Sequence, residues 1–255
     1  MSQIPPVPRD EDPRQAAWAT PVDRLRVEDV PRGAMNINVD GRHVVGPLQG
    51  FGQLWQKTYW VRLPGLALTP EQVMADWKKN FPKFWPKGNH FYAPLVGIAP
   101  GEVAVLNLAM PGGMPLSTGM LVIFADDVSF TMMTPEGHME SGWITFSVFE
   151  QDGAVVAQVQ SIARANDPMY EIGFMLFAHG TQERFWHQTL TALASHFNVP
   201  GQVQMRKTCV DSRWQWNQAR NVWHNAAART GVYLALAPFR WIGSLLRRPA
   251  KPAGG

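Results

Sequence analysis

The sequence predicts an α+β domain in which a run of antiparallel strands is covered by a long amphipathic helix. Three observations predict this class. Apolar residues gather in short segments between positions 53 and 163. Short turns rich in Gly, Pro and Asp, such as 111–113 and 151–153, join these segments, and connections this short exclude parallel crossovers. After Gly180, apolar residues recur at helical spacing as far as Phe197.

The first predicted strand covers 53–63, an aromatic and β-branched run that ends at a Pro-Gly turn. A helix is predicted directly after it. Thr69 is placed as the N-cap, Pro70 as the first helical residue and Gln72 as the third, which is the capping-box pattern. Apolar residues then repeat at three and four positions up to Phe81, so this helix has one buried face.

Five further strands are predicted in the middle of the chain, at 103–110, 119–124, 128–133, 142–149 and 154–163. Thr181 is the predicted cap of the long helix that follows, and the sequence Asn-Val-Pro-Gly at 198–201 ends it. The apolar stripe of this helix needs a surface to cover, and the preceding sheet is the one available.

The chain divides into three segments by composition. Residues 1–33 are rich in Pro, Arg and Asp and are predicted to be a flexible arm, 34–200 form the domain, and 201–255 form a basic amphipathic extension. The extension holds nine Lys/Arg and one acid, a balance of +8, whereas the first 200 residues hold fourteen bases and nineteen acids, a balance of −5. The domain is therefore not expected to bind nucleic acid.

Cysteine content and the N-terminus predict the compartment. The chain has a single cysteine, Cys209, which excludes an intramolecular disulfide and offers no thiolate cluster for a metal. No apolar segment typical of a secretory signal follows the N-terminus. We expect a cytoplasmic protein.

The extension carries a pattern suited to a membrane surface. Between 212 and 230, Arg213 and Arg220 fall on one helical face and Trp216 and Trp223 on another. The apolar run that follows is too short to span a bilayer, which needs about 20 residues. Segment 212–248 is therefore predicted to lie on an anionic membrane surface, as a peripheral attachment to the inner face; the alternative is that it docks on its own domain.

The element order, with Phe-Pro-Lys-Phe-Trp-Pro at 81–86, resembles the START-like (SRPBCC) helix-grip superfamily, which includes polyketide cyclases and lipid-transfer domains. More narrowly, the segments 115–119 and 135–142 look like an uncharacterised domain-of-unknown-function family within it. The resemblance covers about residues 50 to 197 and implies a helix-grip fold: a curved antiparallel sheet wrapped on a long C-terminal helix, with an apolar ligand held between them. The extension at 201–255 departs from that pattern.

Large aromatic residues and methionines are the candidates for lining such a pocket, although ordinary core packing would bury them equally. The predicted ligand-binding residues are Trp77, Phe84, Trp85, Met110, Met132, Trp143, Phe146, Phe174 and Trp186.

Three polar residues are candidates for catalysis. His138 and Glu140 are two apart, so in a strand both point to one face and could work as an acid/base pair; the alternative is a structural turn. Arg164 could hold a ligand carboxylate or could pair with Asp167 at the surface.

Two classes of function find little support. His179, Glu183 and His187 share one helical face, but nothing is placed to complete a metal site, so neither a metal nor a cofactor is predicted. Nucleophile-elbow, phosphate-loop and dinucleotide motifs are missing after the predicted strands, which disfavours standard hydrolase and kinase chemistry.

Three functions stay open. The leading hypothesis is a carrier or sensor that binds a hydrophobic small molecule or lipid in an internal pocket. The alternative is a cyclase, aromatase or hydrolase acting on an apolar substrate in the same pocket. The third is a scaffold with a filled core.

Overall fold

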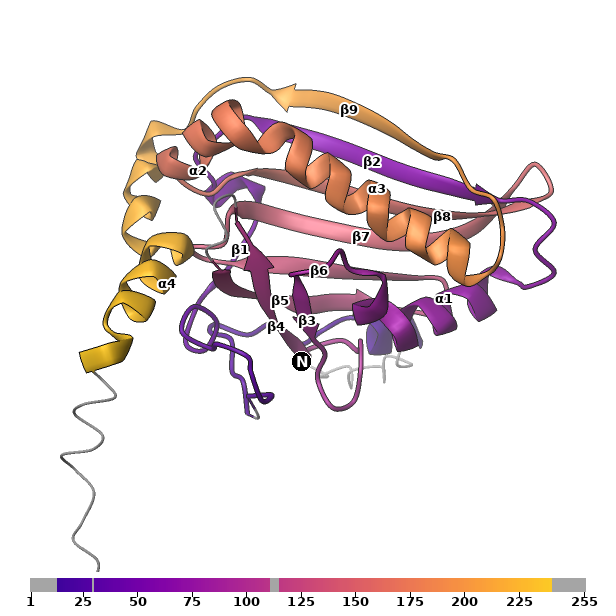
Figure 1. Ribbon diagram of the computed structural model, residues 1–255, viewed down its shortest axis with the longest axis horizontal. Helices are drawn as coiled ribbons and strands as arrows, with labels where there is room; N and C mark the ends of the chain where they lie inside the picture. The colour runs from indigo at the N-terminus through magenta and orange to yellow at the C-terminus, as the bar shows by residue number, and fades with distance from the viewer. Residues whose placement is uncertain (1–12, 29, 111–114, 240–255) are drawn as a thin grey trace, which may run out of the picture.

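The computed structural model describes residues 13–28, 30–110 and 115–239. A nine-stranded antiparallel sheet is its main element, in the order β3-β4-β5-β6-β7-β8-β2-β9, with β1 paired to β6 (Figure 1). The strands are β1 Val44–Val45, β2 Leu54–Leu63, β3 His90–Tyr92, β4 Val103–Ala109, β5 Pro115–Ala125, β6 Ser129–Pro135, β7 Glu140–Gln151, β8 Ala154–Ala165 and β9 Val203–Asp211. The α-helices are α1 Pro70–Asn80, α2 Pro168–Gly173, α3 His179–His196 and α4 Ala226–Ala235.

Shorter helical segments connect these elements. They are the 3-10 turns Pro13–Ala17, Pro47–Gln49, Phe81–Phe84 and Trp216–His224, and the π-helical turn Phe174–Ala178. The α+β class and the antiparallel strand order predicted from the sequence are confirmed.

The first helix forms as predicted. The Thr69 hydroxyl accepts from the backbone N–H of Gln72 at 3.4 Å, and the Gln72 side chain accepts from the backbone N–H of Thr69 at 2.9 Å. This reciprocal capping box fixes the start of α1 directly after β2. The buried face of α1 carries Trp77, whose ring meets Phe146 of β7 edge-on at 5.6 Å between ring centroids.

The main core lies between one face of the sheet and the helices α1 and α3. Figure 1 shows α3 running across that face alongside β2 and β8. Its residues Trp186, Leu190 and Leu193 are buried against the sheet, which is the stripe predicted from the sequence. Phe130 and Phe146, cross-strand partners in β6 and β7, stack at 4.5 Å between ring centroids in the same core.

The predicted start of the long helix was wrong. Thr181 lies inside α3, and helical structure begins at Pro168 and continues through α2 and the π-helical turn. The N-cap is Asp167, whose carboxylate accepts from the backbone N–H of Tyr170 at 3.1 Å, with Pro168 at the first helical position. This Asp-Pro pair is itself a standard helix start. The helix α2 and the π-helical turn lie between it and the start of α3.

The arm predicted over 1–33 makes defined contacts in its described part. Leu25 is buried with Val39, Val105 and Leu121 in a second, smaller core on the outer face of the sheet. Trp18 bridges to Phe124 of β5 and packs on its ring. Isolated apolar residues of this kind show no period, so composition alone does not predict these contacts.

The extension predicted over 201–255 begins with a strand. Residues Val203–Asp211 form β9, which pairs along nearly the whole of β2. The Trp216–His224 turn and α4 follow, in place of the single amphipathic helix expected over 212–230, and α4 packs on β5. Within the described part of the chain, no helix is both long and apolar enough to cross a membrane.

Candidate functional site

A cavity of about 180 Å³ lies between the sheet, the Phe81–Phe84 turn and the N-terminal part of α3. Its wall is mostly apolar and includes a few polar residues. The lining residues are Phe81, Trp85, Asn89, Leu106, Leu108, Ala109, Met110, Met120, Met132, Thr134, His138, Met139, Glu140, Gly142, Trp143, Ile144, Phe146, Ser161, Ala163, Phe174, Gln182, Phe185 and Trp186.

The structure brings most of the predicted ligand-binding residues to this cavity. The seven that line it are Trp85, Met110, Met132, Trp143, Phe146, Phe174 and Trp186. Trp77 and Phe84 do not reach it and are packed in the core instead. Trp77 is enclosed by the sheet and Phe84 contacts His196 near the end of α3, so both fill space between layers.

Several lining residues were missed by sequence reasoning. Leu106, Leu108, Met120, Ile144 and Phe185 complete the apolar wall. The signal that could have found them is the period of two within each strand, because Leu106 and Leu108 share a face of β4 and Ile144 shares a face of β7 with Phe146.

The polar end of the cavity is formed by His138, Glu140 and Gln182. The Glu140 carboxylate accepts from the Gln182 side-chain amide at 2.8 Å and lies 3.8 Å from the Lys57 ammonium group, measured between O and N. Lys57 also donates to the Gln182 side-chain oxygen. Glu140 is therefore held by partners on β2 and α3.

His138 contacts the backbone of Glu140 and not its carboxylate. The backbone N–H of Glu140 points at Nδ1 of His138, 3.0 Å away, and the Glu140 carbonyl oxygen is 3.1 Å from the same nitrogen. Burial disfavours the charged imidazolium and lowers the pKa of His138 to about 4, against a smaller opposing effect of the Glu140 backbone. At neutral pH the imidazole is uncharged.

Residues 75–192 match the family described as a domain of unknown function, DUF1990. This segment of the chain is similar to that family. Every residue that lines the cavity falls inside the matched range. The strands β2 and β9 and the helix α4 fall outside it. No curated protein sequence matches the chain.

Solved structures of similar fold have low sequence identity. The di-domain ARO/CYC protein StfQ of the steffimycin biosynthetic pathway is 8% identical, with 57% of this chain and 51% of that chain covered and a TM-score of 0.44. The solution structure of KanY (ms6282) is 17% identical, with 58% of this chain and 99% of that chain covered and a TM-score of 0.42. Protein Ms6760 from Mycobacterium smegmatis is 10% identical, with 55% of this chain and 89% of that chain covered and a TM-score of 0.41. The helix-grip arrangement expected from the sequence, a curved antiparallel sheet covered by a long helix, is confirmed by the strand order and by the position of α3.

The third catalytic candidate, Arg164, binds the C-terminal extension. It is buried, and its guanidinium donates to the carbonyls of Gly52 at 2.7 Å and Arg213 at 2.9 Å and to the Asp211 carboxylate at 2.6 Å. Hydrogen bonds from Arg213 and Arg164 hold the pKa of Asp211 well below its usual range. The surface pair with Asp167 does not form, because Asp167 is itself buried and bonded to Asn225 at 2.8 Å.

The turn that carries His138 is also covered by the extension. The carbonyl of Gly137 accepts from the backbone N–H of Ala226 at 2.9 Å. Gly137 has φ +85°, and a Cβ at this position would lie 2.0 Å from the carbonyl oxygen of His224. The C-terminal extension therefore packs directly behind the polar end of the cavity.

Glu183 and His187 of the histidine row lie in α3. Among the residues that the structure describes, no three His, Cys, Asp or Glu side chains come close enough together to hold a metal ion. Glu183 instead lies 4.0 Å from the Lys207 ammonium group.

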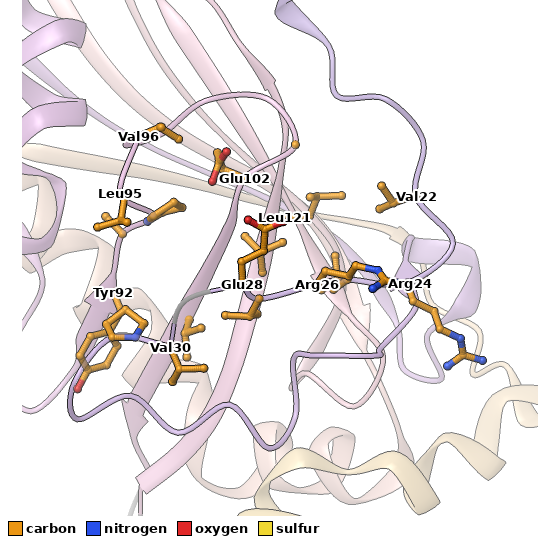
Figure 2. Close-up of a pocket in the computed structure, with 18 of the residues that line it drawn as sticks. Val22, Arg24, Arg26, Glu28, Val30, Tyr92, Leu95, Val96, Glu102 and Leu121 are labelled. Atoms are coloured by element: carbon orange, nitrogen blue, oxygen red, sulfur yellow. The ribbon is translucent and has the colours of Figure 1, made fainter.

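A larger groove of about 820 Å³ lies on the outer side of the sheet, next to the smaller core. Figure 2 shows that it is bordered by the extended segment carrying Arg24, Arg26 and Glu28 and by the loop carrying Leu95 and Val96. Charged side chains of both signs edge this groove and its apolar loop is exposed to solvent, so the inner cavity with its mostly apolar wall is the better candidate site.

Proposed function

We propose that this protein binds an apolar small molecule or lipid in its inner cavity, as a carrier or sensor. The observation that carries this proposal is the wall of the cavity, which is built mainly from aromatic, aliphatic and methionine side chains. The four methionines are Met110, Met120, Met132 and Met139. Methionine is unbranched and polarisable, and therefore adapts to ligands of irregular shape. Burying an apolar ligand here gains about 25 cal/mol for each Å² removed from water.

The chemistry of the polar end favours binding over acid/base catalysis, which is the enzyme alternative. A histidine whose pKa is lowered to about 4 is a weak base at neutral pH, and proton abstraction needs a base with a pKa near the working pH. Glu140, the other half of the predicted pair, is occupied by Gln182 and Lys57.

Native mass spectrometry of the protein purified from its own cells tests this function. We expect a complex whose excess mass is released on denaturation and is extracted into an organic solvent. If the protein is always recovered at the mass of the bare chain, even after incubation with a lipid extract of those cells, the proposal is wrong.

We further propose that the extension attaches the protein peripherally to the inner, anionic face of a membrane. Its packed side is anchored to the domain through buried Asn225 and Thr230. Its outer side exposes large apolar groups, with Trp216 69% and Trp223 80% accessible, next to the exposed Arg220. Tryptophan and arginine together suit the headgroup region of an anionic bilayer. The basic residues after Phe239 belong to the same prediction and lie outside the described residues.

Vesicle sedimentation measures this attachment. We expect binding to vesicles of phosphatidylglycerol and phosphatidylcholine that weakens several-fold in high salt, because surface charges are screened. The double variant Trp216→Ser/Trp223→Ser should bind about tenfold more weakly. Truncation after Gly201 is not a suitable test, because it removes β9 from the sheet.

The matched control is Leu95→Ser, which removes an equally exposed apolar side chain on the outer groove. Equal loss of vesicle binding in this variant and in the double tryptophan variant would contradict attachment through the extension.

A further inference from the structure

The hydrogen-bonding state of His138 can be assigned from its neighbours. The backbone N–H of Glu140 always carries its hydrogen, and it is directed at Nδ1 of His138 from 3.0 Å. If Nδ1 were also protonated, two hydrogens would face one another across this contact. The tautomer in which Nδ1 donates to the Glu140 carbonyl, 3.1 Å away, is disfavoured by this repulsion between two hydrogens. Nδ1 is therefore the acceptor, and the imidazole hydrogen is on Nε2.

The Nε2–H group of His138 is a donor without a protein acceptor. The imidazole is buried and forms part of the cavity wall. Among the described residues, Nε2 makes no hydrogen bond, so its N–H is left to an acceptor in the cavity that the imidazole lines. An acceptor supplied by a ligand would satisfy it.

The charges at this end of the cavity select the kind of acceptor. The Glu140 carboxylate lines the same end, so a second carboxylate placed there would meet a like charge in a poorly solvated site. Lys57, the nearest cation, already faces Glu140 and Gln182 and does not line the cavity. A neutral oxygen, such as that of a ketone or an ester, carries no such penalty.

We propose that the ligand of this cavity carries a neutral carbonyl oxygen, which accepts a hydrogen bond from Nε2–H of His138. This inference rests on the proposed function, because it assigns the polar group of the same apolar ligand. It makes His138 the residue that orients the ligand and distinguishes a carbonyl compound from a hydrocarbon of the same shape.

A pair of nearly isosteric probes tests the proposal: acetophenone, and α-methylstyrene, which has a methylene group in place of the carbonyl oxygen. Both are titrated into the full-length protein and into His138→Asn, with the methyl NMR signals of the cavity methionines as the readout. Asparagine keeps an oxygen near the position of Nδ1 to accept from the Glu140 N–H, but its side chain is too short to replace Nε2–H.

We expect the affinity for acetophenone to fall about tenfold in His138→Asn, which is the usual effect of removing one hydrogen-bond partner, and the affinity for α-methylstyrene to stay the same. If both probes bind and their affinity ratio is unchanged by the substitution, the carbonyl assignment is wrong, whereas the proposal that the cavity binds an apolar ligand is supported. If neither probe binds the wild-type protein, the proposed function fails and the assignment fails with it.

Nitrogen NMR of the wild-type imidazole gives a second readout that does not depend on a variant. We expect Nδ1 to be unprotonated and Nε2 to be protonated at neutral pH, and the Nε2–H signal to shift with acetophenone more than with α-methylstyrene. A hydrogen found on Nδ1 would overturn the assignment.

Discussion

Replacing Gly137 with alanine is expected to lower the free energy of unfolding by about 3 kcal/mol or more, as measured by urea denaturation. The new Cβ would lie 2.0 Å from the backbone carbonyl oxygen of His224, which cannot move away independently of the chain. The residue also has φ +85°, a conformation that side chains other than glycine rarely adopt. Either the turn that carries His138 or the extension behind it must therefore shift.

Gly97→Ala is the matched control. Gly97 has φ +87°, and nothing lies within 4 Å of the position that a Cβ would take there, so only the backbone strain of about 1 kcal/mol should appear. The difference between the two variants measures how closely the extension packs against the His138 turn. Equal destabilisation by both substitutions would show that this packing is not tight.

Acidification is expected to destabilise the protein through His138. The pKa of this group is about 4 in the folded state and 6.5 when it is free, so between these values the unfolded chain binds a proton that the folded protein excludes. The stability contributed by neutral His138 is therefore complete above pH 6.5 and is lost progressively as the pH falls toward 4. Between pH 6.5 and 5 this loss amounts to roughly 2 kcal/mol.

Denaturation of wild-type protein and of His138→Asn over that range isolates this contribution, because Asp and Glu residues titrate alike in both. The wild type should lose roughly 2 kcal/mol more than the variant by pH 5. Parallel curves for the two proteins would mean that His138 is protonated as easily in the folded state as in the unfolded chain.

The fold could be predicted from the sequence where the signals are local. The Thr69 capping box and the Gly- and Asp-containing turns act within a few residues, so α1 and the antiparallel strand order followed from them. The start of the long helix was missed because two capping patterns compete, and Asp167-Pro168 precedes Thr181. Strand β9 was missed because its pairing with β2 joins segments almost 150 residues apart, and its Arg and Lys residues hide the strand pattern.

The candidate site was predictable in its composition and not in its contacts. Aromatic and methionine residues indicated the apolar wall, but residue type does not separate cavity from core, so Trp77 and Phe84 were included although both are fully packed. The partner of Arg164 was predicted as its near neighbour Asp167, whereas the structure pairs it with Asp211, a residue of β9. Such long-range contacts depend on the assembled sheet.

The central claim is that the inner cavity is a ligand site, and filling it is the most direct measurement. Ala163 lines the cavity, whereas Gln158 on the same strand lies on the outer face of the sheet. Methyl NMR titration with α-methylstyrene should show saturable shifts of the cavity methionines in wild-type protein and in Gln158→Leu, and no saturable shifts in Ala163→Leu. Binding that is absent from all three proteins, or that survives unchanged in Ala163→Leu, would contradict the account.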